Sequence, residues 1–443
     1  RKTAQEMLEF IRISPTCFHA VANIGRMLEA AGFQQLQEKE EWKLEKGGRY
    51  YTERNDSSVI AFVIPEKEVG IRGFHMAAAH SDSPCFKIKE KPELTVEEHY
   101  LRLNTEKYGG MILSTWLDRP LSVAGRLAVK NGNGIEGRLV NIDRDLCVIP
   151  NVAIHMNREM NKGVEYNPQV DLLPLLADVT FDAHDAQTAS ENAEEQPETV
   201  EKPTLAALAA ETAGVDAETI LGEDLFLYTR QEGKMIGAKG EFVLSPRLDD
   251  LQSAFALTKA FTESTPAEYI NLCAVFDNEE VGSGTRQGAD STFLEDTLQR
   301  ITEGLQEGHS TYLRWVADSF LISADNAHAV HPNHPEKADP ANRPYLNGGI
   351  VIKYHGSQKY TTDGISAARM KDYCERAKVP YQTYANRSDI AGGSTLGNIS
   401  TAHVSVSSVD IGLPQLAMHS AVETAGMKDT EYAVRALKEF WGE

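Results

Sequence analysis

The chain has 443 residues, of which 41% are hydrophobic and 25% are charged, so it has enough apolar material for a large folded core, and its length predicts two domains. Its 65 acidic and 44 basic residues give a formal net charge of -21. This charge repels nucleic-acid phosphates and anionic lipid surfaces. We therefore expect a peptide or small-molecule ligand, with no nucleic acid and no membrane as a partner.

Cysteine usage and hydropathy predict the compartment. The five cysteines are scattered and form no Cys-x-x-Cys pair, which is typical of reduced thiols in the cytoplasm. No apolar run approaches the roughly 20 residues that a membrane-spanning helix needs, and the beginning of the chain lacks the apolar core of a secretory signal. We expect a soluble, cytoplasmic protein.

The beginning of the chain predicts helices followed by strands. Apolar residues recur at helical spacing over 3–11 and 20–31. Residues 49–65 predict two paired strands, and 73–79 predict a buried strand that runs into His80. Chemistry is often found where such a strand ends.

Between 86 and 239 the pattern changes to short alternating strands, which we interpret as an inserted β-rich domain. Residues 132–137 match the spacing of a dinucleotide-binding loop, but that loop must open a helix. Here both flanks predict strands joined by Asn-Gly dipeptides, so we expect a hairpin and no nicotinamide or flavin cofactor. Residues 183–201 are rich in Ala, Glu, Gln and Asp and predict a solvated loop.

The remainder of the chain alternates helices with strands. A helix is predicted from 250 to 263. Apolar strands, each ahead of an acidic residue or a histidine, are predicted at 270–276, 320–323 and 404–411. This order predicts an α/β fold with a mixed, mostly parallel sheet between two layers of helices. The catalytic domain would be discontinuous, with 1–85 as its first part and 240–443 as its second.

Histidines and carboxylates gather at the ends of these predicted strands and in adjoining loops. Imidazole and carboxylate ligands without thiolates suit a hydrolytic zinc, cobalt or manganese site, whereas a structural zinc site would be expected to contain cysteines. Taken singly, each segment has a simpler explanation, such as a loop histidine near an acid or a solvated acidic turn. The segments are His80-Ser81-Asp82, Asp249-Asp250, Glu279-Glu280, Asp325 and His419.

The spacing within the segments suggests roles. In an extended backbone His80 and Asp82 project to the same side, so Asp82 can accept a proton from the ring nitrogen that does not face a metal. The adjacent Glu279 and Glu280 repel each other without a cation, but one can bind the ion while the other takes a proton from metal-bound water. Two metals roughly 3.5 to 4 Å apart need a bridging group. Asp249 is our candidate, and a helix cap is its alternative role.

Together these segments resemble the aspartyl aminopeptidases, which are grouped with vacuolar aminopeptidase I. The correspondence spans nearly the whole chain, and the motifs occur in the order of the family. Asp250 departs from the asparagine that the family pattern has beside the bridging aspartate, and an extra carboxylate there could alter metal preference. The matching motifs are His80-Ser-Asp-Ser-Pro-Cys85, Thr115-Trp-Leu-Asp-Arg119, Ser245-Pro-Arg-Leu-Asp249, Phe276-Asp-Asn-Glu-Glu-Val-Gly-Ser283, Ser323-Ala-Asp-Asn-Ala-His328 and Pro414-Gln-Leu-Ala-Met-His-Ser420.

The resemblance implies a dinuclear metal centre, with zinc as the first expectation and cobalt or manganese as alternatives. Glu279 would be the general acid/base, and Asp82 would orient His80. The ligand sets would be His80, Asp249 and Asp325 for one ion, and Asp249, Glu280 and His419 for the other.

The resemblance also implies substrate contacts and an assembly. Lys353 and Tyr360 match a lysine and a tyrosine of the family's substrate pocket. The family forms tetrahedral dodecamers, in which a histidine of the inserted domain reaches a neighbouring subunit's site. His155 resembles that histidine, although a buried strand histidine is its simpler interpretation. We expect a homo-oligomer, a tetrahedral dodecamer, in which segment 86–239 serves for oligomerisation or as a lid.

The predicted function is metal-dependent hydrolysis of the N-terminal residue from peptides with a free N-terminus, by a metal-bridging water with Glu279 as general base. The cationic Lys353 and the family favour an acidic residue, Asp or Glu, at that position. Two alternatives stay open. One is a dinuclear-metal deacylase or carboxypeptidase, because the same centre serves many amides. The other is a non-catalytic, shell-forming homologue.

For the loop histidines His328, His331 and His334 we expect surface or structural roles.

Overall fold

The computed structural model describes residues 1–66, 70–181, 204–393 and 395–443. The chain divides into two compact units, which we call the discontinuous unit (1–83 and 232–443) and the inserted unit (84–231). The roles predicted for segments 1–85, 86–239 and 240–443 stay predictions. The acidic segment 183–201 lies outside the described residues.

The discontinuous unit is built on a nine-stranded mixed sheet with the order β1-β2-β3-β13-β4-β14-β18-β16-β17. Its middle strands β13, β4, β14 and β18 run parallel, and three of them are buried along their whole length, as expected for a sheet that is covered on both faces. The strands are β1 (Gln34–Gln35), β2 (Arg49–Arg54), β3 (Ser58–Val63), β4 (Phe74–His80), β13 (Ile270–Phe276), β14 (Phe320–Ala324), β16 (Ile350–Tyr354), β17 (Tyr381–Ala385) and β18 (Ser407–Gly412).

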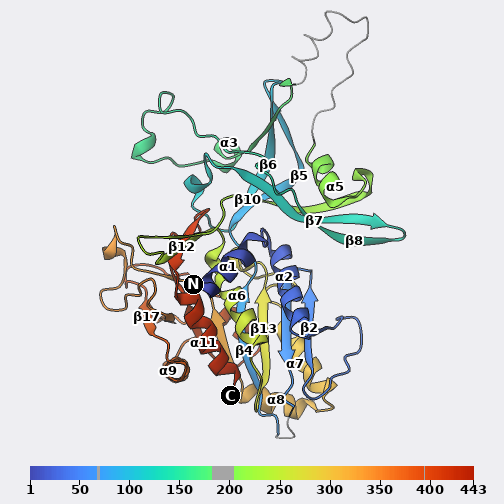
Figure 1. Ribbon diagram of the computed structural model, residues 1–443, viewed down its shortest axis with the longest axis vertical. Helices are drawn as coiled ribbons and strands as arrows, with labels where there is room; N and C mark the ends of the chain where they lie inside the picture. Colours follow the sequence, from blue (N-terminus) through green and yellow to red (C-terminus); the bar gives the residue numbers. More distant parts are fainter. Residues whose placement is uncertain (67–69, 182–203, 394) are drawn as a thin grey trace, which may run out of the picture. The chain divides into compact units, whose positions relative to one another are not determined.

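Helices cover both faces of this sheet (Figure 1). Successive residues of β4 alternate between two apolar clusters, with Met76 and Ala78 in one and Ala77 and Ala79 in the other, because side chains of a strand point to opposite faces. The α/β fold with a mixed, mostly parallel sheet is thereby confirmed. One cluster includes α1 (Lys2–Arg12), α2 (Cys17–Ala30), α6 (Leu248–Thr262), α9 (Gly364–Ala377) and α11 (Asp429–Trp441), and the other includes α7 (Phe293–Gly304), α8 (His309–Ala317) and α10 (Leu396–His403).

A smaller five-stranded sheet also belongs to the discontinuous unit. Its order is β11-β12-β20-β19-β15. Two of its strands, β15 and β19, directly follow β14 and β18 of the large sheet along the chain. It joins segments that are distant in the sequence, since β12 pairs with β20 and β19 pairs with β15. The strands are β11 (Lys234–Ile236), β12 (Phe242–Ser245), β15 (Ala327–His328), β19 (Pro414–Leu416) and β20 (Glu423–Gly426).

The inserted unit contains a six-stranded antiparallel sheet with the order β8-β7-β10-β5-β6-β9. Strands β7 and β8 pair up to Asn131 and Gly134, so the glycine-rich segment is the turn of a hairpin, as predicted, and opens no helix. The elements are β5 (Cys85–Val96), β6 (Tyr100–Tyr108), β7 (Leu121–Asn131), β8 (Gly134–Asn141), α3 (Pro168–Asp171), β9 (Leu175–Asp178), α5 (Leu205–Ala213) and β10 (Ile220–Thr229).

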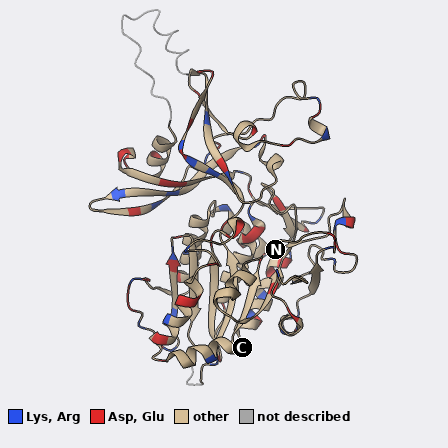
Figure 2. Cartoon of the chain, turned by 180° about the vertical axis from the view of Figure 1, so that it is seen from behind, with Lys and Arg blue, Asp and Glu red and all other residues tan. Residues whose placement is uncertain are grey.

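Charged residues lie on helices, strands and loops of both units (Figure 2). None of the five cysteines, all of which lie in the described ranges, forms a disulfide, and four of them are buried. Of the helices in the described ranges, none combines the length and the apolar character that a bilayer-spanning segment needs.

His75 on β4 makes stability depend on pH. The ring is 3% exposed and stacks between Tyr269 and Phe440, with centroids 3.7 and 4.6 Å away. Burial lowers the pKa of His75 to about 4, so the unfolded chain binds the proton first as pH falls. We expect His75 to cost about 2 kcal/mol of unfolding free energy between pH 7 and 5.

Urea denaturation at several pH values tests this expectation. The variant His75→Phe should lose that part of the decline in stability below pH 7. The exposed His309 provides the matched control, and His309→Phe should keep the slope of the wild type. A slope that is the same in all three proteins would contradict the prediction.

Candidate metal centre

Neighbouring parallel strands bring the predicted ligands to one edge of the large sheet. His80 is the last residue of β4 and lies opposite Phe276 at the end of β13. Beyond β13, Glu279 and Glu280 form a short 3-10 turn, and Asp325 follows the end of β14. Because parallel strands end at the same edge, residues as far apart in the sequence as His80 and Asp325 meet there.

Asp249 faces two imidazoles at once. Its Oδ1 lies 3.3 Å from Nε2 of His80, and its Oδ2 lies 3.3 Å from Nε2 of His419. The backbone of Asp249 and Asp250 departs from helical angles although both residues belong to α6, and their peptide bond is cis. The first residue before α6 is Arg247, without a side-chain cap. Asp249 and Asp250 directly precede the regular part of the helix, so a role at its start stays compatible with metal binding, and the two oxygens of Asp249 each face one imidazole.

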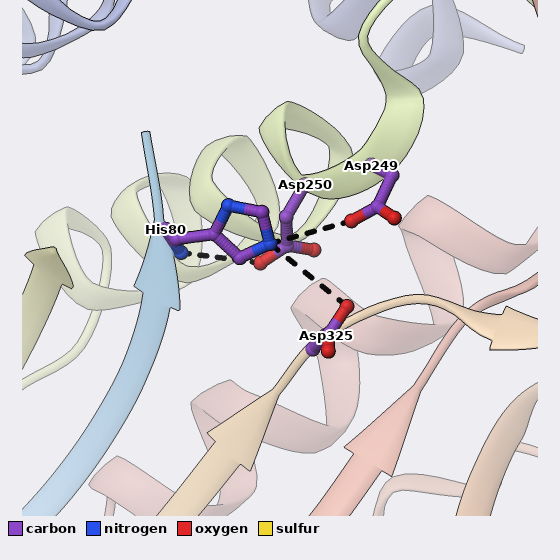
Figure 3. A group of neighbouring side chains, drawn as sticks. All are labelled: His80, Asp249, Asp250 and Asp325. Atoms are coloured by element: carbon purple, nitrogen blue, oxygen red, sulfur yellow. Dashed lines mark hydrogen bonds and ion pairs between the residues drawn. The ribbon is translucent and has the colours of Figure 1, made fainter. Parts of the chain in front are cut away.

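The remaining carboxylates complete two groups of donor atoms. Asp325 Oδ1 lies 3.9 Å from His80 Nε2, and Glu280 Oε2 lies 3.4 Å from His419 Nε2. Within each group the potential donor atoms lie within 4.8 Å of one another. Figure 3 shows the first group, with the His80 ring directed toward Asp249 and Asp325. These two groups are His80, Asp249, Asp250 and Asp325, and Asp249, Glu280 and His419; a third group that meets the same criterion consists of His80, Glu279 and Glu280.

Unsatisfied oxygens indicate that these residues fit a cation. Glu280 Oε1 and Asp250 Oδ1 are buried and accept no hydrogen bond from the residues that the structure describes. Burying such a group without a partner costs free energy. Imidazole nitrogens and carboxylate oxygens are ligands for zinc, and both groups consist only of these donors.

The electrostatics support the same conclusion. Burial, together with the Asp325, Asp82 and Asp249 carboxylates, raises the pKa of Glu279 to about 8, although His80 opposes the rise. Burial and Asp249 likewise hold the pKa of Glu280 well above its usual value. Asp249 differs, because contacts with His419 and His80 outweigh burial and lower its pKa. A divalent cation among these carboxylates would favour their ionised forms and so oppose the rise in the pKa values of Glu279 and Glu280.

Asp82 contacts three residues of the centre, His80, Glu279 and Glu280. Its Oδ1 lies 3.3 Å from Nδ1 of His80, the ring nitrogen that faces away from Asp249. Its two oxygens accept hydrogen bonds from the backbone N–H groups of Glu279 and Glu280, each at 3.1 Å. The sequence suggested only the first contact. The second fixes the turn that carries both glutamates.

Asp250 belongs to this cluster. It is fully buried, and its Oδ2 accepts a hydrogen bond from the backbone N–H of His80 at 3.2 Å. Burial keeps the pKa of Asp250 well above its usual value. The carboxyl group that departs from the family pattern is thus hydrogen-bonded to the backbone of His80.

A cavity of about 330 Å³ opens onto the centre. The buried Lys353 directs its Nζ toward Asp325 Oδ2 at 3.7 Å, donates to the carbonyl oxygen of Asn326 at 3.1 Å, and lies 5.3 Å from the centroid of the Tyr360 ring. The predicted site residues that line the cavity are Asp249, Glu279, Asp325, Lys353, Tyr360 and His419.

Sequence reasoning missed part of the cavity wall. His328, Tyr384, Gly393 and Thr395 also line it. Two of these segments carried a usable signal: His328 follows Asp325 by three residues, and Gly393 and Thr395 lie in a glycine-rich segment ahead of a predicted helix, where backbone N–H groups can bind a carbonyl or carboxylate. The side chain of His328 is exposed, and its surface or structural role stays a prediction.

His155 lies in the inserted unit, within a turn at 154–156, and its side chain is exposed. The simpler interpretation of a buried strand histidine is therefore wrong. The alternation of Val152, Ile154 and Met156 resembles a strand, but all three side chains are exposed. A role for His155 in substrate binding stays a prediction.

Known proteins resemble this chain along almost its whole length. The family described as "Aminopeptidase I zinc metalloprotease (M18)" matches residues 10–441. The protein "Probable M18 family aminopeptidase 2" of Clostridium novyi is 47% identical over 444 residues, which cover 99% of this chain and 98% of the relative.

Solved structures agree with this similarity. A chain in the cryo-EM structure of the Ape4 and Nbr1 complex matches with a TM-score of 0.92 and 37% identity, covering 99% of this chain and 85% of the other. The S. cerevesiae mApe1 dodecamer matches with a TM-score of 0.81 and 26% identity, covering 99% and 95%. Both the metal-binding chemistry of the site and these matches lead to one conclusion: the chain belongs to the M18 family of zinc aminopeptidases, as its ordered motifs predicted.

Proposed function

We propose that the chain removes the N-terminal residue from peptides with a free N-terminus, using two divalent cations, zinc in the first place. One cation would be held by His80, Asp249 and Asp325, and the other by Asp249, Glu280 and His419. The observation that carries the proposal is the position of Asp249, which presents one oxygen to each histidine at 3.3 Å. A single metal site would account for only one of these two contacts.

Glu279 is the proposed general base. When bound, the cations would polarise the scissile carbonyl and acidify water. Glu279 lines the cavity and would accept the proton of the attacking water and then donate it to the leaving amine. Asp82 supports this role, because its bonds to the Glu279 and Glu280 amides let one side chain face the cavity while the other approaches His419.

For the residue that is removed we propose an acidic side chain. Lys353 is the buried cation of the cavity wall, with Tyr360 beside it. An ammonium in a buried site attracts a carboxylate more strongly than a neutral side chain, because a charge-assisted hydrogen bond would add to its contact with Asp325. Family members that prefer neutral residues are the competing case.

We also propose that the chain acts as a homo-oligomer, a tetrahedral dodecamer. The support is a solved relative that is itself a dodecamer and the exposed apolar segment of the inserted unit, in which Val152, Ile154 and Met156 are 50%, 45% and 82% exposed. His155 lies within this segment. In the proposed assembly it would reach the site of a neighbouring subunit, with the inserted unit serving for oligomerisation or as a lid.

Glu279→Gln tests the general base. The amide keeps the shape of the side chain but cannot take a proton, so we expect kcat to fall by about 100-fold to 10,000-fold while zinc content and thermal stability stay unchanged. Glu280→Gln is the matched comparison, because the neighbouring variant should lose zinc as well as activity. Turnover near that of the wild type in a zinc-replete Glu279→Gln protein would refute the assignment.

Blocked substrates separate an aminopeptidase from other amide hydrolases. We expect peptides with a free N-terminus to be cleaved and their N-acetylated forms to resist, because the free amine is needed for binding. After chelation, activity should vanish and return with zinc, cobalt or manganese. Cleavage of the acetylated peptides alone would instead identify a deacylase, and release of the C-terminal residue would identify a carboxypeptidase.

Lys353→Met tests the preference for acidic residues. Lys353 also contacts Asp325, so its loss should reduce activity on every substrate. We therefore compare kcat/KM for an Asp-peptide with that for an Ala-peptide within each protein, which cancels the common loss. The ratio should fall by about 10-fold to 100-fold, as expected for the loss of one charge-assisted hydrogen bond. An unchanged ratio would show that selectivity lies elsewhere.

A further inference from the structure

Glu423 is a buried carboxylate outside the proposed ligand sets. It is the first residue of β20 and is 2% exposed. Its Oε2 accepts a hydrogen bond from the backbone N–H of Asp249 at 3.0 Å, and its Oε1 accepts one from the backbone N–H of His419 at 2.8 Å. One carboxyl group therefore contacts the backbone of the proposed bridging ligand and that of a ligand to the second cation.

The loop that carries His419 depends on such a contact. It connects the paired strands β19 and β20, and within it Ala417 and His419 have φ values of 56 and 66°. Residues with a side chain adopt this left-handed region at a cost, so surrounding contacts must hold them there. The bond from the His419 amide to Glu423 is such a contact, and it joins the loop to the strand that follows it.

The contact with Asp249 has a similar purpose. Residues 249 and 250 have non-helical backbone angles, so the helix does not itself set the direction of the Asp249 side chain. The hydrogen bond to Glu423 spans 174 positions of the sequence. It fixes the Asp249 backbone relative to β20, and hence relative to His419, which shares the same carboxylate.

A buried side-chain network extends this link to the third ligand segment. Gln415 donates to Glu423 Oε1 at 3.4 Å and accepts a hydrogen bond from the Asn326 side chain at 2.8 Å. Asn326 directly follows Asp325, and its amide also donates to the carbonyl oxygen of Leu248 at 3.0 Å. Hydrogen bonds between buried side chains thus connect the segments that carry Asp249, Asp325 and His419.

We propose that Glu423 is a positioning residue of the metal centre, which holds Asp249 and His419 at the separation that two cations require. The proposal rests on the ligand sets of the proposed function. Glu423 acts through two backbone amides and contacts neither the substrate nor the reacting atoms. Residues that orient metal ligands in this way commonly matter for metal affinity, and replacing one typically lowers the affinity about 10-fold to 100-fold.

Glu423→Gln is the direct test. The amide keeps the size of the side chain, but its NH₂ group replaces one acceptor and faces a backbone N–H donor. We expect zinc affinity, measured by competition with a chromogenic chelator, to fall about 10-fold to 100-fold. The visible absorption spectrum of the cobalt-loaded protein should change as well, because the arrangement of ligands changes.

Asp429→Asn is the matched control. Asp429 is a fully buried carboxylate in the same unit that also accepts two backbone hydrogen bonds, from Asn347 at 2.7 Å and Gly349 at 2.9 Å. We expect this variant to lower the melting temperature but to leave zinc affinity and the cobalt spectrum unchanged. If Asp429→Asn lost as much zinc affinity as Glu423→Gln, the effect would be one of general stability and the proposal would be overturned.

Two further outcomes are decisive. A folded Glu423→Gln protein with the zinc affinity and cobalt spectrum of the wild type overturns the proposal. If that variant does not fold, the same measurements on Glu423→Asp decide, since this shorter carboxylate cannot reach both amides and should also bind zinc more weakly; unchanged values would overturn the proposal. Failure of the wild type to bind zinc or cobalt would overturn the ligand sets themselves, which distinguishes the two failures.

Discussion

The mutual repulsion of buried carboxylates is the constraint on which the site depends. Asp249, Asp250, Glu280 and Asp325 share a space in which donor atoms lie within 4.8 Å of one another in each group. Ionised carboxylates at such spacing in a buried place are unfavourable unless positive charge lies between them. The two histidines provide only part of that charge. Bound cations would stabilise the ionised carboxylates of such a site, and the surrounding fold holds these carboxylates close together.

The large sheet brings the ligand segments together, and the hydrogen-bonded carboxylates orient the residues of these segments. Parallel strands β4, β13 and β14 end side by side, so the chain topology alone brings three ligand segments to one edge. The strand ends do not fix where a loop residue points. That is achieved by Asp82, which binds the amides of Glu279 and Glu280, and by Glu423, which binds those of Asp249 and His419. Backbone amides are suited to this purpose because they leave the ligand side chains free for the metal.

The sequence predicted the parts of the site that follow from local pattern and from residue chemistry. Apolar strands ahead of His80 and Asp325 are visible as continuous runs, and imidazole with carboxylate predicts a hydrolytic metal. The non-helical start of α6 was not predictable, because the helical spacing that follows Asp249 suggests an ordinary cap. Nor was the contact of Glu423, since no periodic pattern connects residues 174 positions apart. The exposed turn around His155 was missed because its alternating apolar residues imitate a strand.

On the proposed function, Lys353 would connect metal binding to substrate selection. Its ammonium is buried and lies 3.7 Å from Asp325, so it lowers the cost of ionising a proposed metal ligand, while on the proposed assignment it also attracts the substrate's acidic side chain. Burial opposes its charge, yet the carboxylates of Asp325 and Asp410 raise its pKa, so Lys353 stays protonated in either role. A chain that replaced this lysine to accept neutral residues would also change the charge balance around Asp325. On these assignments, selectivity and metal affinity would change together at this position, and a change in preference would require a compensating change among the carboxylates.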